Sequence, residues 1–364
     1  MTDNAPMRWS ALDRTESAHG RMRAAAHAAP RWIIRLSLAF ILPALLYIAL
    51  REAPLRDIGT ALARLRPWEI AALLCLNALI YCLAACRWWV VVHAENRHIR
   101  YLPMIGVRLS VFAVSYFTLG PQVGGEPLQI LYLRKSYGLS YTRATASVIM
   151  DKLFELLANF VLLCFGLFAA FHSGILGRVH EASLPLLLLG GLVVAWPAVH
   201  ILMLYHKAYP LSALLRMLGR RVAKKRAIRF LRATEHLAGQ FCQRHPRAMM
   251  SGLVISLVAA AATVSEYALI TSFLHIGLPF WRLVTAWTTG WLSFLAPWPG
   301  GLGTLELGQV SVLGSFGVSA AAALSVVLVM RARDLLIGGV GLLLAGNAAG
   351  SAQIQNRKAR RIHG

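Results

Sequence analysis

The sequence predicts an all-α polytopic membrane protein with about six full transmembrane helices, two re-entrant broken-helix hairpins and two inverted repeats. Hydrophobic residues make up 57% of the 364-residue chain, and charged residues make up 14%. Apolar runs of about 20 residues recur along the chain, as they do in helical membrane proteins. The ten-residue alternation of a membrane β-barrel is not seen. Finally, two segments about 180 residues apart repeat each other.

Six apolar stretches are long enough to cross a bilayer as helices, which takes about 20 residues. The polar first 30 residues lack the apolar core of a cleavable signal peptide, so we expect the first span to remain in the protein. The predicted spans lie near residues 32–50, 69–92, 145–171, 184–205, 248–274 and 320–346.

Two further apolar stretches, 104–136 and 283–316, are interrupted at Gly120–Glu126 and Pro297–Glu306. Each half is too short to span a bilayer alone, so each stretch is predicted to enter and leave on one side. Non-helical backbone at that depth is tolerated only inside protein or beside a wet cavity. The predicted hinge residues are Pro121, Gly124, Gly125, Gly300, Gly301 and Gly303.

The two repeats, about 102–171 and 281–347, carry the same chemistry in the same order. Each has a Pro/Gly break, a glutamate, a Gly-x-Ser, a base and an acid. Gly138 to Glu155 is 17 residues, and so is Gly317 to Asp334. Paired Gly/Pro-interrupted segments in two halves are the best sequence indication of a transporter's binding site.

The placement of charge predicts the topology. The net charge is +22, but the basic residues lie in connections between spans, which is typical of a membrane protein and not of a nucleic-acid-binding one. The strongly basic segment 206–247 is predicted to be cytoplasmic and to lie along anionic lipids. Both the polar tail 1–30 and the basic tail 348–364 are then predicted to be cytoplasmic, and the two hairpins are predicted to open to opposite sides. We expect the membrane to be the bacterial inner membrane.

Eight ionisable residues lie in or near the apolar zone of the repeats, where each costs about 2.5–3.5 kcal/mol at a helix centre. They must therefore pair or face water, and intramembrane charge is functional by default. These predicted substrate-binding residues are Glu126, Asp151, Lys152, Glu155, Glu306, Arg331, Arg333 and Asp334.

The three bases Lys152, Arg331 and Arg333 are able to hold a phosphate. The half-helices that begin near Glu126 and Glu306 also favour anions at their N-termini, while these two glutamates could bind a cationic headgroup or carry a proton. Helical spacing makes Asp151 and Lys152 neighbours of Glu155, and Arg331 a neighbour of Asp334.

The alternative interpretation is that these charges form internal salt bridges that fix helix packing, above all Asp151 and Arg333, which depart from the repeat. Glu266 is either a further site residue or a packing partner. Asn77 is expected to form an interhelical hydrogen bond, and Arg87-Trp88-Trp89 is expected at an interface or in packing. Catalytic and metal-binding motifs are missing, so neither a catalytic residue, a cofactor nor a metal is predicted.

Gly-Gly-Glu-Pro-Leu-Gln at 124–129, the Asp151-Lys152 pair, and the segment 299–306 followed by Arg331 resemble the lysylphosphatidylglycerol synthase transmembrane-region family of flippase-like proteins. The resemblance covers a transmembrane domain of about 31–347. That family commonly has an arginine shortly after its Gly-Glu, where this chain has Gln129, and an arginine where it has Lys152. Bifunctional members add a soluble aminoacyltransferase domain, for which no room follows the last span.

The resemblance implies translocation without lipid aminoacylation. The predicted function is a lipid flippase that moves a phospholipid, aminoacyl-lipid, polyprenyl-linked lipid or hopanoid, with the membrane lipid as substrate and a lipid-biosynthesis protein as a further partner. Two alternatives remain open at this point. One is a membrane-embedded group transferase, and the other is a non-catalytic subunit of an envelope biosynthesis complex.

Overall fold

The computed structural model describes residues 60, 62–117, 124–174, 195–217, 226–295 and 301–362. All of them belong to a compact unit that extends from Ala53 to Gly364. The described residues form helices and turns without a strand, which confirms the all-α class. The predicted span at 32–50 and the tail 1–30 lie outside the described residues, as do Pro121 and Gly300.

Three described helices are long and apolar enough to cross a membrane: α4 (Pro67–Glu95), α7 (Tyr141–His172) and α12 (Pro246–Phe273). They confirm the spans predicted near 69–92, 145–171 and 248–274. The predicted span at 184–205 is described only for the apolar helix Ala195–Tyr205. The span at 320–346 lies within α15 (Ala320–Ile362), whose middle carries charged residues and which continues well beyond the predicted end.

Both interrupted stretches form a pair of short helices, as predicted. The first pair is α5 (Leu102–Phe117) and α6 (Glu126–Tyr137), and the second is α13 (Phe280–Ser293) and α14 (Thr304–Ser315). None of these helices reaches the length of about 20 residues that a bilayer requires. The two helices of each pair pack against each other.

The Gly-x-Ser of each repeat marks the boundary between a short helix and the long helix that follows. Gly138 and Gly317 have φ values of 67° and 87°, a left-handed conformation that commonly ends a helix. The Ser140 hydroxyl accepts a hydrogen bond from the Arg143 amide, and the Ser319 hydroxyl accepts one from the Ala322 amide. Each serine therefore caps the N-terminus of its long helix.

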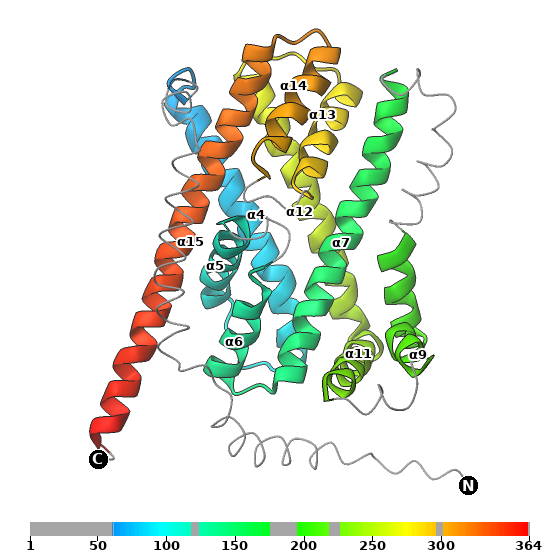
Figure 1. Cartoon of the computed structure of the whole chain (residues 1–364), viewed down its shortest axis with the longest axis vertical. Helices are drawn as coiled ribbons and strands as arrows, with labels where there is room; N and C mark the ends of the chain where they lie inside the picture. The colour runs from blue at the N-terminus through cyan, green and yellow to red at the C-terminus, as the bar shows by residue number, and fades with distance from the viewer. Residues whose placement is uncertain are drawn as a thin grey trace. The chain divides into compact units, whose positions relative to one another are not determined.

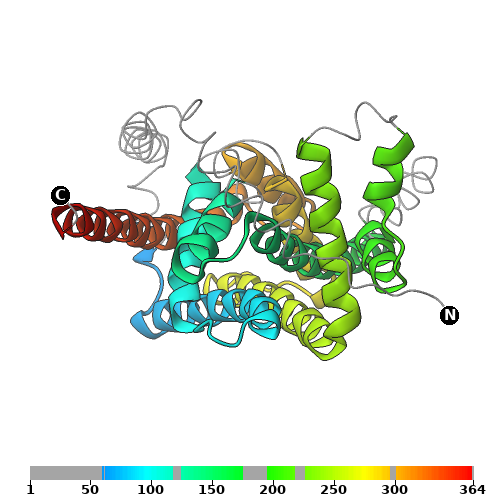
Figure 2. The same cartoon turned by 90° about the horizontal axis from the view of Figure 1, so that it is seen from below.

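The two repeats run in opposite directions (Figures 1 and 2). In Figure 1, α6 ends and α7 begins toward the lower end of the view, whereas α14 ends and α15 begins toward the upper end. Helix α7 therefore ascends from the first hairpin while α15 descends from the second. This arrangement agrees with the predicted inverted repeats.

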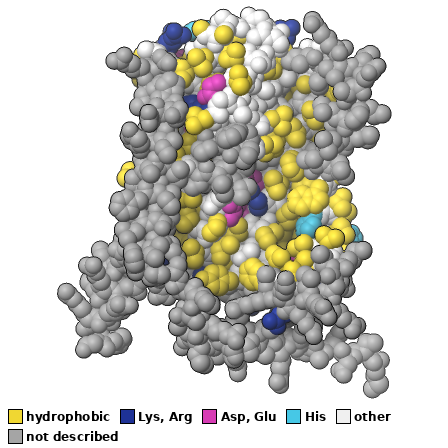
Figure 3. Space-filling view, in the orientation of Figure 1, with side chains coloured by type: hydrophobic (Ala, Val, Ile, Leu, Met, Phe, Trp, Pro, Cys, Tyr) yellow, Lys and Arg dark blue, Asp and Glu magenta, His cyan; other side chains and the backbone are white. Residues whose placement is uncertain are grey.

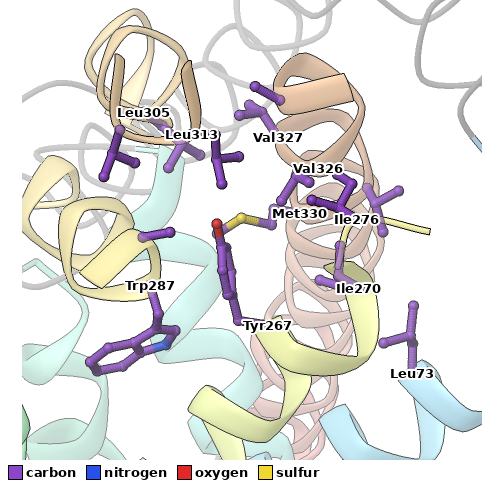
Figure 4. Packing of buried hydrophobic residues seen from close by; sticks show 14 of the residues in the cluster. Leu73, Tyr267, Ile270, Ile276, Trp287, Leu305, Leu313, Val326, Val327 and Met330 are labelled. Carbon is purple, nitrogen blue, oxygen red and sulfur yellow. The ribbon is translucent and has the colours of Figure 1, made fainter. Parts of the chain in front are cut away.

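Hairpin two is attached to the neighbouring long helices by its apolar side chains (Figure 4). Leu305 and Leu313 of α14 pack in one buried cluster with Tyr267 of α12 and with Val327 and Met330 of α15. Hairpin one is attached to α4 through a separate cluster that includes Trp88, Met104 and Leu133. Each hairpin thus packs in a hydrophobic cluster of its own.

The described part of the basic segment 206–247 includes the amphipathic helices α9 (Pro210–Met217) and α11 (Arg226–Arg244). Cys242 of α11 is buried beside Phe154 of α7 and Leu204. Burial raises the pKa of the Cys242 thiol to about 12, so little thiolate is present at neutral pH.

We therefore expect Cys242 to stay unlabelled by a water-soluble maleimide at neutral pH in a folded variant whose other cysteines are replaced by serine. Labelling should increase as the pH rises toward the pKa. Arg229→Cys in the same background is the control, because Arg229 is exposed on the same helix. Equal labelling of the two thiols, measured by mass spectrometry, would contradict the buried position of Cys242.

Candidate functional site

A cavity of about 290 Å³ lies between the hairpins and the long helices. Its walls come from α4, α5, α6, α7, α12, α13 and α15, so both repeats contribute to it. Six of the eight predicted site residues line the cavity: Glu126, Asp151, Lys152, Glu155, Arg333 and Asp334. Outside the cavity, the described helices expose apolar side chains such as Phe168 and Val254.

Figure 3 shows hydrophobic side chains over much of the described part of one face, with a small group of acidic and basic side chains among them. A charge among apolar helices is costly unless it is paired or reaches water. The cavity and the ion pairs within it satisfy that requirement.

On α7, Asp151 and Glu155 share a helix face, as their spacing predicted, and bind the same two arginines. Arg87 of α4 donates to Asp151 Oδ1 and to Glu155 Oε2, each at 2.6 Å. Arg108 of α5 donates to Asp151 Oδ2 at 2.9 Å and to Glu155 Oε2 at 2.6 Å. Lys152 adds a third cation, 2.9 Å from Glu155 Oε1. Three helices are thereby joined at one buried cluster.

Arg87, which was expected at an interface or in packing, is buried within this ion-pair cluster. Its side chain is 4% exposed and pairs with both acids of α7. Arg108 was not predicted as a site residue at all. The signal available in the sequence was a charge imbalance: an Asp151 without a repeat counterpart requires an additional base, and both arginines lie within apolar stretches.

Glu126 and Glu306 occupy equivalent positions and make equivalent contacts. Glu126 Oε2 accepts from the Gly124 amide at 2.8 Å, and Glu306 Oε2 accepts from the Gly303 amide at 2.9 Å. In each glutamate the other oxygen faces the base on the following long helix. Glu126 Oε1 is 3.7 Å from Lys152 Nζ, and Glu306 Oε1 is 2.8 Å from Arg331 Nη2.

These contacts change the expected role of the half-helix N-termini. Each glutamate already holds a backbone N–H that precedes its own helix, and the Gly125 amide donates to Ser115. These donors are therefore not free for a phosphate. Gly303, with φ of 80°, makes the turn into α14 in a conformation that suits glycine. At Gly125 a Cβ atom would collide with the Val111 carbonyl of α5.

Arg331 lies outside the cavity lining and joins hairpin two to hairpin one. Its guanidinium is bound to Glu306 and donates to the Gly301 carbonyl at 3.1 Å, while Nη1 donates to the Tyr116 hydroxyl of α5 at 3.2 Å. Tyr116 itself lines the cavity. Arg331 is thus positioned to couple the two hairpins, and it reaches the cavity through Tyr116.

A second charged cluster lies on the α12 and α15 side of the cavity. Arg333 pairs with Glu266 at 2.6 Å and with Asp334 at 2.7 Å. The expected neighbour pair of Arg331 and Asp334 is therefore replaced, because each residue finds a partner in another direction. Glu266, left open as a site or packing residue, lines the cavity and accepts from Asn77 of α4 at 2.7 Å. That bond confirms the interhelical role predicted for Asn77.

The charges of the cavity lining nearly balance. The cations among its described residues are Arg87, Arg108, Lys152 and Arg333, and the acids are Glu126, Asp151, Glu155, Glu266 and Asp334. Every one of these cations is in an ion pair. The acids exceed the bases by one, so an incoming anion has to displace a carboxylate, whereas a neutral or cationic group does not.

Fold and site together define a multi-pass helical membrane protein in which two broken-helix repeats both contribute to a cavity that contains charged side chains. The chain belongs to the lysylphosphatidylglycerol synthase TM region family, which matches residues 32–341. It is similar to a UPF0104 membrane protein of Pyrococcus horikoshii, with 25% identity over 295 residues that cover 74% of this chain and 85% of the relative. No solved structure matches it. The family membership confirms the resemblance seen in the sequence and supports a lipid-related role in a membrane.

Proposed function

We propose that the protein moves the polar headgroup of a membrane lipid between leaflets through the cavity between its repeats. The observation that carries the proposal is a cavity lined by charged side chains of both repeats, inside helices whose outer faces are apolar. A lipid headgroup has to be shielded from the hydrocarbon while its tails stay in it. Broken helices that meet beside a polar cavity are the usual construction of a transporter site.

Lys152 is the cation best placed to meet a headgroup phosphate. Its side chain is 25% exposed, the most of the four cations in the lining, and its distance of 3.7 Å to Glu126 is longer than a hydrogen bond. Moving from Glu126 to a phosphate oxygen costs Lys152 little, because it keeps its contact with Glu155. Glu126, once released, is then available to a cationic part of the headgroup or to a proton.

Arg331 and Glu306 act in this proposal on the conformation of the hairpins. Their pair links the start of α14 to α15, and the bond from Arg331 to Tyr116 links both to α5. A switch between inward and outward states requires two arrangements of packed elements. Breaking and remaking the contacts of Arg331 provides such a change at the junction of the repeats.

The orientation belongs to the same proposal. The amphipathic basic helices α9 and α11 lie at the cytoplasmic surface of the bacterial inner membrane, beside anionic lipids. Both termini are cytoplasmic, and the hairpins open to opposite sides.

The test is lipid translocation by purified protein in liposomes, followed with fluorescent phosphatidylglycerol and phosphatidylethanolamine and a membrane-impermeant quencher. Glu126→Gln and Arg331→Ala are each expected to slow translocation at least about tenfold, the typical worth of a charge-assisted hydrogen bond. Arg229→Gln, on the exposed face of α11, is the matched loss of charge outside the cavity and should keep the wild-type rate.

Wild-type rates in folded Glu126→Gln and Arg331→Ala proteins would overturn the site assignment. A wild-type protein that translocates no lipid, yet forms a modified lipid in detergent, would replace the flippase with the group transferase. Translocation requires two leaflets and cannot occur in detergent, whereas lipid modification can. The detergent assay therefore separates the two activities.

A further inference from the structure

Two buried glutamines occupy equivalent positions in the repeats and differ in their contacts. Gln129 follows Glu126 by three residues, and Gln309 follows Glu306 by three. Their exposed fractions are 1% and 0%. A buried carboxamide normally has its hydrogen bonds satisfied by neighbouring groups. The hydrogen bonds of the two glutamines can therefore be compared to find which repeat has a polar group without a partner in the protein.

Both polar atoms of the Gln309 side chain form hydrogen bonds within the protein. Its Oε1 accepts from the Tyr267 hydroxyl at 2.6 Å, and its Nε2 donates to the Ala286 carbonyl at 2.9 Å. Gly290 of α13 also packs closely on this amide, since a Cβ there would lie 2.7 Å from Nε2. Each polar atom of the Gln309 side chain thus has a hydrogen-bond partner within the protein, one on α12 and one on α13.

Gln129 is different, because its Nε2 is buried and has no hydrogen-bond partner among the described residues. Gln129 lines the cavity together with Glu126, and the spacing of three places both on one face of α6. An unsatisfied buried donor is unfavourable in itself, and a bound group that accepts its hydrogen bond would remove that cost.

The charge balance of the cavity narrows the chemistry of that group. Each cation of the lining is held by a carboxylate, and the acids exceed the bases by one. A second anionic group beside Gln129 would meet this surplus of negative charge. A hydroxyl carries no charge, and a carboxamide can donate to a hydroxyl and accept from it at the same time.

We propose that Gln129 is a specificity-determining residue that reads a hydroxyl of a polyol or sugar headgroup, next to the phosphate held by Lys152. This inference rests on the proposed function and assigns recognition to hairpin one alone. Hairpin two, with Gln309 and Arg331 already bonded, serves as the closed counterpart. The two repeats therefore share a fold, but only the first repeat recognises the headgroup hydroxyl.

The experiment is an equilibrium titration of detergent-solubilised protein with short-chain phosphatidylglycerol and phosphatidylethanol, followed by tryptophan fluorescence. Trp287 and Trp291 line the cavity and provide the signal. Both lipids carry one phosphodiester charge, and phosphatidylethanol lacks the hydroxyls. The wild type is expected to prefer phosphatidylglycerol about tenfold, which corresponds to about 1.4 kcal/mol. Phosphatidylglucose, which keeps the phosphodiester, is a third ligand that distinguishes a sugar headgroup from a glycerol headgroup.

Gln129→Leu should remove the preference by weakening the hydroxylated ligand, with its melting temperature equal to or above that of the wild type. The matched variant Gln309→Leu should keep the preference and melt earlier, since Tyr267 and Ala286 lose their partner. A wild type that binds phosphatidylethanol and the hydroxylated lipids alike, or none of them, overturns the proposal. A preference for phosphatidylglycerol that persists in Gln129→Leu also overturns the proposal.

This binding test is independent of transport. If the wild type shows a Gln129-dependent preference but moves no lipid in liposomes, the flippase proposal fails and the assignment of Gln129 stands. If it moves lipids without any preference for a hydroxyl, the flippase proposal stands and the assignment of Gln129 fails.

Discussion

Replacing Glu155 by Gln is expected to destabilise the folded protein by about 3–5 kcal/mol, the usual cost of leaving buried charges without their partner. Glu155 is 17% exposed and holds Arg87, Arg108 and Lys152 at 2.6–2.9 Å. The variant retains Asp151 as the remaining acid of α7 for these cations. The measurement is the melting temperature in detergent, together with the fraction of monodisperse protein after extraction.

A compensating variant separates the loss of charge balance from the loss of side-chain packing. Glu155→Leu should be as destabilised as Glu155→Gln, whereas Glu155→Leu with Lys152→Met removes one acid and one base together. The two arginines then share Asp151 as before. Recovery of most of the lost stability in the double variant is expected. If Glu155→Gln melts like the wild type, the cluster is not the junction of α4, α5 and α7 that we describe.

Gly341→Ala is expected to destabilise the protein by about 3 kcal/mol, at the upper end of the usual cost of overpacking. A Cβ at this position would collide with the Leu109 carbonyl of α5 and lie 2.8 Å from the Ala113 Cβ. The Ser110 hydroxyl also donates to the Gly341 carbonyl at 3.2 Å. Because the obstacle is backbone, α5 and α15 must separate.

The matched control is Gly339→Ala in the same helix, where an added Cβ meets nothing within 4 Å. Alanine favours a helix over glycine by up to about 1 kcal/mol, so this variant should be neutral or slightly more stable. Thermal unfolding of both variants measures the difference. A separation of α5 from α15 also moves Tyr116 away from Arg331, so slower lipid translocation is expected for Gly341→Ala. Equal melting temperatures would show that the two helices do not pack as closely as described.

The pairing of the charges shows where sequence reasoning was sufficient. The contacts of Lys152 and Asp151 around Glu155 follow from helical spacing, which places residues three and four apart on one face. The contacts made by Arg87, Arg108 and Glu266 join α4, α5 and α12 to residues far away in the sequence. No local pattern encodes those distances. For the same reason, Arg331 pairs with Glu306 and not with Asp334, which is nearer in the sequence.

The sequence by itself determined the apolar spans, the two interrupted hairpins and the repeat, because each follows from local hydropathy, helix-breaking residues and spacing. It also placed charge beside both breaks. Only the tertiary structure decided that both polar atoms of Gln309 have partners while Gln129 Nε2 has none among the described residues. It also decided that Arg87 and Arg108 bind the two acids of α7. The physical reason is that a hydrogen bond depends on the position of a partner to within a few tenths of an ångström, and packing between distant helices sets that position.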